Sequence, residues 1–248
     1  MNIQGKKVLV TGGGSGIGLA IAQAFTDKGA RVILAGRNES RLAQAAASLK
    51  DASYIVADVT KAEDVDVLVS RITKDHGGLD ILVNNAGVGN VISLDAESGI
   101  YENARWEIEI NYLGVVRLTE KLLGLLKRSS EAAIINIQSV LSYSPNAALG
   151  TYSATKAALH SYSQGLRLVL QKNHPQVRVF EVFPPLVDTD LTRGFDAEKL
   201  SPAEVANDVI TGVENEEYAI RNGVTKDLYA LFHQSPEAAL KQLNPALV

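Results

Sequence analysis

The sequence predicts an α/β fold: a doubly wound parallel sheet with helices on both faces, in a single domain. Two observations carry this prediction. Short, mostly apolar segments alternate along the whole chain with longer amphipathic ones, as strands buried on both faces alternate with the helices that cover them. The first apolar segment also runs directly into a glycine-rich turn, 12–18, followed by an amphipathic segment. A strand, a glycine turn and a helix in this order are typical of a Rossmann-type sheet.

Six strands are expected, each a short and largely apolar run. They are Lys7–Thr11, Arg31–Ala35, Ser53–Ala57, Leu79–Val83, Ala132–Ile137 and Val177–Phe183. Consecutive parallel strands are joined by right-handed crossovers, so these segments build one doubly wound sheet.

Helices are expected between the strands, where apolar residues recur at helical spacing. They cover 19–28, 38–49, 61–76, 101–127 and 151–170, and a further helix starts at Ser201-Pro202. Asn38 and Thr60 are the expected N-caps of the second and third helices. Gly29 and Gly77 are expected to end the first and the third.

Composition excludes several functional classes. The chain of 248 residues carries a net charge of −4 without a basic run, which argues against nucleic acid as a partner. No stretch approaches the ~20 apolar residues of a membrane span. There is no cysteine, and the four histidines lack ligand-like spacing, so we expect no thiolate chemistry, no disulfide and no metal site. Because the N-terminus has no apolar leader, we expect a cytoplasmic protein.

The glycine turn matches T-G-x-x-x-G-x-G through Thr11, Gly12, Gly16 and Gly18, rather than the common G-x-G-x-x-G. Glycines permit positive φ and let the backbone approach a pyrophosphate at a helix N-terminus. A glycine-rich surface turn is the alternative. The position between the first strand and the first helix favours nucleotide binding.

The end of the second strand bears on the choice of nucleotide. NAD-binding domains usually carry an acid there, which holds the ribose 2′-hydroxyl. This chain has Ala35-Gly36-Arg37 instead, and a guanidinium suits a 2′-phosphate. A solvated arginine before a helix is the alternative. We therefore expect NADP(H) to be preferred, with NAD(H) possible.

Ser139, Tyr152 and Lys156 form the candidate catalytic group. Tyr152 and Lys156 are four residues apart on an expected helix and so share one face. A phenol has a pKa of about 10, which a neighbouring ammonium lowers toward neutrality. Ser139 ends an apolar strand, where its hydroxyl could hold a substrate carbonyl against the tyrosine. Tyrosine and lysine at this spacing also occur on ordinary solvated helix faces, so the pair alone does not establish catalysis.

Together, these motifs resemble those of the short-chain dehydrogenase/reductase family, in its single-domain branch, over nearly the whole chain. Thr11 to Gly18 resembles the family's cofactor loop, Asp58-Val59 its adenine-contacting acid, and 84–87 (Asn-Asn-Ala-Gly) its structural NNAG motif. The resemblance implies a cofactor half at about 1–130 and a catalytic and substrate half at about 131–248. The family's catalytic tetrad falls on Asn111, Ser139, Tyr152 and Lys156.

The resemblance implies a role for each of these residues. Tyr152 is the general acid in reduction and the base in oxidation, Lys156 lowers its pKa and bonds the nicotinamide ribose, and Ser139 orients the carbonyl. Asn111 holds a water that links Lys156 to solvent. The implied cofactor-binding residues are Gly12, Gly14, Ser15, Gly16, Ile17, Gly18, Arg37, Asp58, Val59, Asn85, Ala86, Gly87, Tyr152, Lys156, Pro184, Val187 and Thr189.

Two regions depart from the family pattern. Pro185 stands where the family commonly has glycine after the sixth strand, which makes this loop stiffer. The C-terminal segment lacks the V-D-G-G signature of many family tetramers, and it looks more like the DltE-type oxidoreductases. The C-terminal departure argues against the usual tetramer and against a 3-oxoacyl carrier-protein reductase, which stays an alternative.

In this family the segments after the catalytic serine and after strand six line the substrate pocket. Here they supply a largely apolar set, which suits a hydrophobic or aromatic carbonyl or alcohol of small size, although ordinary core and lid packing would explain each residue singly. The set is Leu141, Tyr143, Leu149, Leu186 and Leu191, with Phe195 beside it. The polar segment at about 188–201 is the expected lid.

The helices expected at 101–127 and 151–170 pair between subunits across the family, so a homodimer is expected, with a tetramer as the alternative. An NADP(H)-binding regulatory protein without turnover is a second possible function, but such proteins usually lose the tyrosine or lysine that this chain keeps. Nucleotide-sugar epimerases also use Tyr-x-x-x-Lys, but they need a larger C-terminal domain than the roughly fifty residues after Asp196 allow.

Overall fold

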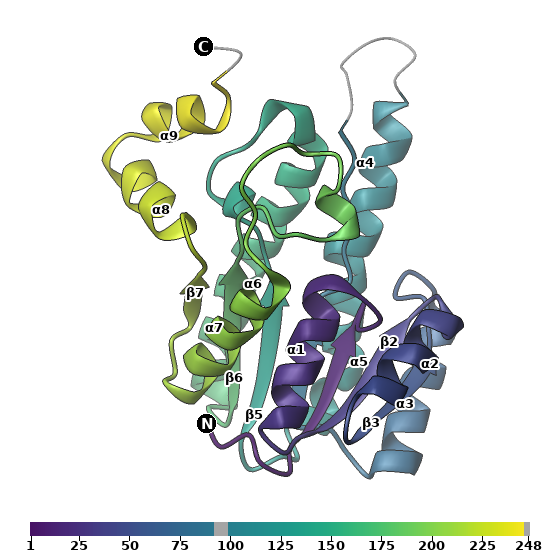
Figure 1. The fold of residues 1–248 in the computed structure, drawn as a ribbon. Helices are drawn as coiled ribbons and strands as arrows, with labels where there is room; N and C mark the ends of the chain where they lie inside the picture. The colour runs from purple at the N-terminus through teal and green to yellow at the C-terminus, as the bar shows by residue number, and fades with distance from the viewer. Residues whose placement is uncertain (92–98, 246–248) are drawn as a thin grey trace.

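The computed structural model describes residues 1–91 and 99–245, and within them the strands form one parallel sheet in the order β3-β2-β1-β4-β5-β6-β7 (Figure 1). The strands are β1 (Lys7–Thr11), β2 (Arg31–Gly36), β3 (Ala52–Val56), β4 (Ile81–Asn84), β5 (Ala132–Ile137), β6 (Val177–Phe183) and β7 (Ala219–Arg221). The chain begins in the middle of the sheet, winds to one edge, returns and winds to the other. This is the predicted doubly wound topology, confirmed for all six predicted strands and extended by β7.

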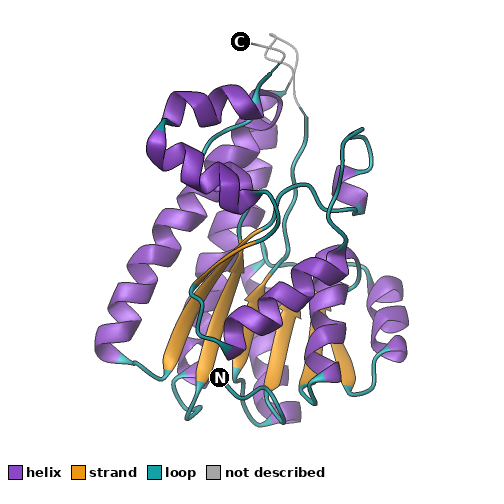
Figure 2. Ribbon diagram, turned by 60° about the vertical axis from the view of Figure 1, so that its left-hand side comes forward, coloured by secondary structure: helices purple, strands orange, loops and turns teal. Residues whose placement is uncertain are grey.

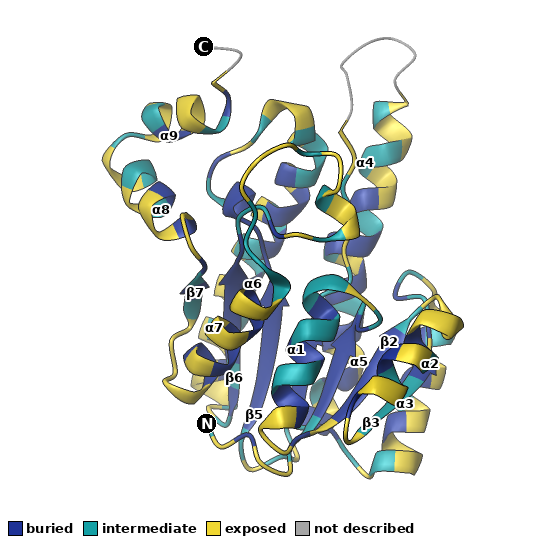
Figure 3. Cartoon of the chain, viewed as in Figure 1, coloured by how far each residue is buried: buried dark blue, intermediate teal, exposed yellow. Residues whose placement is uncertain are grey.

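Helices cover both faces of the sheet, as Figure 2 shows. One layer contains α1 (Gly16–Asp27), α2 (Glu39–Ser48) and α7 (Pro202–Glu214), and the other contains α3 (Ala62–His76), α5 (Gly114–Leu126) and α6 (Gly150–Asn173). Each layer closes its own apolar cluster against the strands. Figure 3 shows the result: buried strands between helices whose outer faces are exposed. No described helix is both long enough and apolar enough to cross a bilayer.

Several helix ends follow from local chemistry. Asn38 accepts a hydrogen bond from the Arg41 amide and caps α2, as predicted. Gly77, at φ 68°, ends α3, a conformation that favours glycine. Ser201 opens α7 with a capping box that Glu204 completes.

The predicted Thr60 cap of α3 is wrong. The N-cap position is Lys61, and the Thr60 hydroxyl donates to Asp58 Oδ1 at 2.8 Å instead. Asp64, in the first turn of α3, accepts from the Asp58 amide at 2.9 Å. Thr60 therefore stabilises the turn that presents Asp58.

The long helix predicted at 101–127 is interrupted. It consists of α4 (Ile100–Ile108), a π-helical turn (Glu109–Leu113) and α5. π-Turns inside α-helices occur frequently at functional sites, and this one carries Asn111, one of the predicted catalytic residues.

The last two helices, α8 (Thr225–Gln234) and α9 (Pro236–Leu243), pack against each other beyond β7. They close a third apolar cluster with the 3₁₀ turn Val140–Ser142 that follows β5. Leu149 and Tyr152 pack against the same cluster. The C-terminal hairpin therefore forms one wall beside the predicted catalytic tyrosine.

Candidate active site

The predicted site residues lie in the segments that follow the carboxyl ends of the central strands, where ligands bind in open α/β sheets. The glycine turn follows β1, the motif 85–87 follows β4, Ser139 follows β5, and Pro184 follows β6. The order β1-β4-β5-β6 makes these four segments neighbours at one edge of the sheet.

The glycine turn leaves no room for side chains. Gly12 and Gly16 have positive φ, at 63° and 53°. A Cβ on Gly18 would lie 2.4 Å from both the Gly12 carbonyl oxygen and Asn85 Nδ2. The backbone segments therefore pack closely at the start of α1, and that arrangement fits the pyrophosphate of a dinucleotide.

Thr11 joins the glycine turn to the segment after β4. Its hydroxyl accepts from the amides of Asn85 and Ala86, both at 3.0 Å, and donates to the Val83 carbonyl. Asn85 Nδ2 donates back to the Thr11 carbonyl at 2.9 Å. The two motifs predicted to hold the cofactor thus form one hydrogen-bonded unit.

Arg37 and Asp58 border the same hollow, of about 570 Å³, together with Trp106 on α4. Arg37 is exposed at the end of β2. Burial raises the pKa of the Asp58 carboxyl, but hydrogen bonds from Thr60 and the charge of Arg37 outweigh it, so the pKa lies below the ordinary value. Asp58 is therefore a ready hydrogen-bond acceptor at the predicted adenine end.

A second hollow, of about 620 Å³, separates the start of α1 from the predicted lid, and Ser15, Gly16 and Thr189 contribute to its wall. The lid is held at its base, since Val187 pairs with Leu200 as an isolated parallel bridge. Arg41 on α2 reaches across to Asp190 in the lid at 3.2 Å. None of the four tetrad residues lines either hollow.

Tyr152 lies in the first turn of α6, with Gly89 packed on its ring. A Cβ on Gly89 would lie 2.8 Å from Tyr152 Cδ2. Burial raises the pKa of Tyr152 to about 12; a hydrogen bond with Ser139 opposes the rise, and the negative charge of Glu107 adds to it. Tyr152 is half-buried, so its desolvation is incomplete.

Lys156 is buried, and its Nζ donates to the Ile137 carbonyl at 2.8 Å. Burial lowers its pKa to about 8, and its Nζ lies 5.6 Å from the centroid of the Tyr152 ring. The sequence led us to expect that Lys156 lowers the pKa of Tyr152. Burial raises the pKa of Tyr152, and the Lys156 ammonium is directed to a carbonyl, so the lowering by Lys156 stays a prediction.

Ser139 caps the 3₁₀ turn, and its Oγ accepts from the Leu141 amide at 3.1 Å. A hydroxyl that accepts from the backbone keeps its own proton to donate. Ser139 also forms a side-chain hydrogen bond with Tyr152, so the two hydroxyl groups lie next to each other.

Asn111 ties three segments together. Its Nδ2 donates to the Val88 carbonyl at 2.8 Å and to Thr155 Oγ1 at 3.0 Å, and its Oδ1 accepts from the Val88 amide at 2.9 Å. A Cβ on Gly87 would lie 3.4 Å from Asn111 Oδ1 and 3.7 Å from Lys156 Nζ. The structure therefore brings Asn111 and Lys156 to the same glycine. The water predicted at Asn111 stays a prediction.

The predicted substrate residues fall into separate groups. Leu141 and Leu149 pack in the cluster beside Tyr152. Tyr143 lies on the Phe183 ring, with centroids 4.7 Å apart, and accepts from Arg221 Nε at 3.2 Å. Leu186 and Phe195 are half-buried, whereas Leu191 is 46% exposed in the lid. Leu141 and Leu149 thus share an apolar cluster with Tyr152.

Sequence reasoning missed a group of polar residues around Tyr152. Asn103 Nδ2 donates to Thr151 Oγ1 at 3.2 Å, and Asn90 Nδ2 donates to Asn103 Oδ1 at 2.8 Å. Glu107 Oε1 accepts from the Asn90 amide at 3.0 Å. The available signal was the spacing of Asn103, Glu107 and Asn111, four residues apart on a helix that faces α6.

The comparison with known families agrees with this geometry. Residues 6–200 match the model of the short chain dehydrogenases. The chain belongs to the short-chain dehydrogenase/reductase family. It is accordingly an NAD(P)-dependent oxidoreductase, as the sequence predicted.

Known relatives and solved structures match this short-chain dehydrogenase/reductase over most of its length. An uncharacterized oxidoreductase of Staphylococcus aureus (strain MRSA252) is 36% identical over 227 residues, covering 89% of this chain and 96% of the relative. A short chain dehydrogenase from Burkholderia cenocepacia, solved in complex with NADP, is 27% identical, with a TM-score of 0.85. The match covers 98% of this chain and 99% of that one. One from Burkholderia phymatum in complex with NAD shares the fold at 23% identity, with a TM-score of 0.86 and coverage of 96% of both chains.

Proposed function

We propose that this protein interconverts a small hydrophobic or aromatic carbonyl compound and its alcohol, with NADP(H) preferred and Tyr152 as general acid and base. The observation that carries the proposal is the meeting of Ser139, Tyr152 and Lys156 at the end of β5, beside the glycine unit. A phenol and a second hydroxyl directed at one oxygen are what a carbonyl needs as it gains negative charge.

The cofactor supplies or accepts the hydride. The Gly12–Gly18 backbone and Asn85 would hold its pyrophosphate side, and Lys156 its ribose. The protein's own part concerns the substrate oxygen. In reduction, the Ser139 hydroxyl donates a hydrogen bond to that oxygen while the Tyr152 proton transfers to it; in oxidation the proton returns to the phenolate. Burial raises the pKa of Tyr152 and so favours the protonated phenol, the form that reduction consumes.

Arg37 supports the preference for NADP(H). It is exposed and lines the hollow that Asp58 borders. The Burkholderia cenocepacia relative, whose structure contains NADP, is consistent with this preference.

A homodimer is proposed through the outer faces of α5 and α6. Leu113, Leu168 and Val169 are large apolar residues exposed on this side, at 40%, 69% and 57%. Light scattering on the purified protein measures the assembly directly, and a monomer at micromolar concentration would refute this part of the proposal.

The catalytic proposal is tested by initial rates with NADPH and NADH over a panel of aliphatic, aromatic, steroid-like, sugar and β-ketoacyl carbonyls. Tyr152→Phe is the control, with cofactor binding measured separately by fluorescence. We expect turnover with NADPH that Tyr152→Phe abolishes while cofactor affinity is kept. Turnover that persists in Tyr152→Phe would remove the assignment of Tyr152.

A further inference from the structure

Glu107 lies in the middle of a polar contact between α4 and α6. Asn103, one turn before it, bonds Thr151, and Asn111, one turn after it, bonds Thr155. The three α4-side residues are four apart and so share one helix face. Glu107 is thereby placed opposite the turn of α6 that carries Tyr152.

Glu107 is fully buried, with 0% of its surface exposed. One carboxylate oxygen accepts from the Asn90 amide, and the other, Oε2, has no hydrogen-bond partner within residues 1–91 and 99–245. A buried carboxylate with an unpaired oxygen is costly, and an apolar residue of similar size would be cheaper there. Packing alone therefore does not explain this residue.

Glu107 anchors the segment Gly89-Asn90, which packs against the ring of Tyr152. Gly89 lies against the face of Tyr152, and the next residue, Asn90, is fixed by both Glu107 and Asn103. Glu107 thus reaches Tyr152 in two ways: through the backbone of Gly89-Asn90, and through its own charge across the α4–α6 contact.

We propose that Glu107 is a positioning residue for Tyr152, which fixes the Gly89-Asn90 segment on the phenol ring and uses its buried negative charge to keep that phenol in the proton-donating form. The inference rests on the proposed role of Tyr152 as general acid. It assigns to Glu107 a part in setting the pH range of the reaction.

The other described groups around Tyr152 do not carry a negative charge. Its own helix contributes Lys156, the turn after β5 contributes the Ser139 hydroxyl, and α8 and α9 contribute apolar side chains. Among the described residues, the charge of Glu107 follows burial and Ser139 as an influence on the pKa of Tyr152, and it raises that pKa.

Glu107→Gln is the test, since the amide keeps an acceptor for Asn90 and loses the charge. Glu109→Gln is the matched control: Glu109 is two residues further on, 37% exposed, and paired with Arg117 instead. In reduction, activity falls as Tyr152 loses its proton at high pH. We expect the alkaline limb of kcat/KM to move toward acid by about one pH unit in Glu107→Gln, from the loss of a nearby like charge, and to stay in place in Glu109→Gln.

Glu107→Asp separates the two parts of the role. It keeps the charge but shortens the reach to Asn90, so we expect a lower kcat with the alkaline limb unchanged. A purely structural role would lower kcat in all Glu107 variants without moving the limb in any, and that result would overturn the proposal.

A second readout needs no substrate. Tyrosinate absorbance is followed at alkaline pH in wild type, Glu107→Gln and Glu109→Gln, each compared with its Tyr152→Phe counterpart to isolate Tyr152. We expect the Tyr152 signal to appear at lower pH only in Glu107→Gln. An unchanged signal refutes the charge effect even if no carbonyl in the panel is turned over, whereas turnover that survives Tyr152→Phe refutes the proposed function instead.

Discussion

Arg167→Met should destabilise the fold strongly, because it leaves a buried carboxylate without its cation. Glu181, in the interior strand β6, is 1% exposed and accepts from Arg167 Nη2 at 2.6 Å. His160 Nδ1, at 2.6 Å, and Gln138 Nε2, at 3.1 Å, are its remaining partners. Breaking a buried pair costs about 3–5 kcal/mol, and these two partners place the expected loss near the lower value, about 3 kcal/mol.

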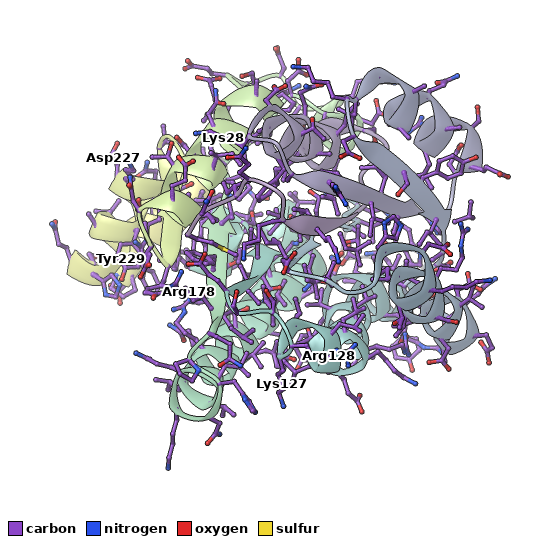
Figure 4. The ribbon with its side chains drawn as sticks, turned by 90° about the horizontal axis from the view of Figure 1, so that it is seen from below. Lys28, Lys127, Arg128, Arg178, Asp227 and Tyr229 are labelled. Carbon is purple, nitrogen blue, oxygen red and sulfur yellow. The ribbon has the colours of Figure 1, made fainter. Side chains whose placement is uncertain are left out.

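Arg178→Met is the matched control. Its side chain is as exposed as that of Arg167, at 23%, and it lies at the start of β6; Figure 4 labels it. Its partner Glu131, however, is 30% exposed. Solvated pairs of this kind contribute about 0–1 kcal/mol. The two variants therefore remove similar side chains and differ chiefly in how buried the abandoned acid is.

The assay is thermal and urea unfolding of the cofactor-free protein, followed by circular dichroism. At about 2–4 °C per kcal/mol for a chain of this size, Arg167→Met should lower Tm by about 6–12 °C and Arg178→Met by at most about 4 °C. Equal losses in the two variants would show that the burial of Glu181 does not decide the cost, and the reasoning would fail.

Three further predictions concern the site. Arg37→Ala should weaken NADPH binding by about 1.5–3 kcal/mol and leave NADH almost unchanged, measured by fluorescence titration; equal losses for both would remove Arg37 from the 2′-phosphate. Gly18→Ala should destabilise the protein by about 1–3 kcal/mol and weaken the binding of both cofactors, because the new Cβ would lie 2.4 Å from the Gly12 carbonyl oxygen. Gly124→Ala, where a Cβ meets no atom within 4 Å, should be neutral or stabilising in the same unfolding assay. Lys156→Met tests the burial of the lysine, whose pKa is about 8 in the folded protein against an ordinary value of 10.5. Because the unfolded chain binds more protons between these two pH values, the free energy of unfolding of the wild type should rise relative to that of the variant by about 2–3 kcal/mol from pH 8 to 10. A difference that does not change with pH in urea unfolding would contradict this prediction.

Much of the fold was predictable because its signals are local. The six predicted strands are short apolar runs. The glycine turn and the caps Asn38 and Ser201 are also local signals, because each interacts with residues close to it in the sequence. β7 was missed because it contains three residues, of which Ile220 alone is buried, so no alternation is visible. The Thr60 cap was predicted wrongly because two oxygen-bearing side chains compete at that turn and Asp58 takes the threonine hydroxyl.

The site was predictable where residue type and spacing together indicate chemistry, as for Tyr152 and Lys156. The direction of the Tyr152 pKa was not, because it depends on how deeply two groups are buried and where the ammonium points. Glu107 was missed for a related reason. A polar residue on an amphipathic helix is normally assigned to the solvent face, and only the packing of α4 on α6 shows that this stripe faces inward.

The π-turn at 109–113 explains how one helix can present two faces in different directions. In an α-helix each residue turns by about 100°, so side chains spaced by four drift by about 40° at every step. Asn103 and Asn111, eight residues apart, both still bond α6, while Leu118 and Leu122 of α5 enter the core on the same face of the sheet. The wider turn absorbs part of the drift. Deleting one residue there would make the helix regular, but either the polar side chains or the leucines would then rotate away from their partners. The π-turn therefore lets one helical segment contact both α6 near Tyr152 and the apolar core.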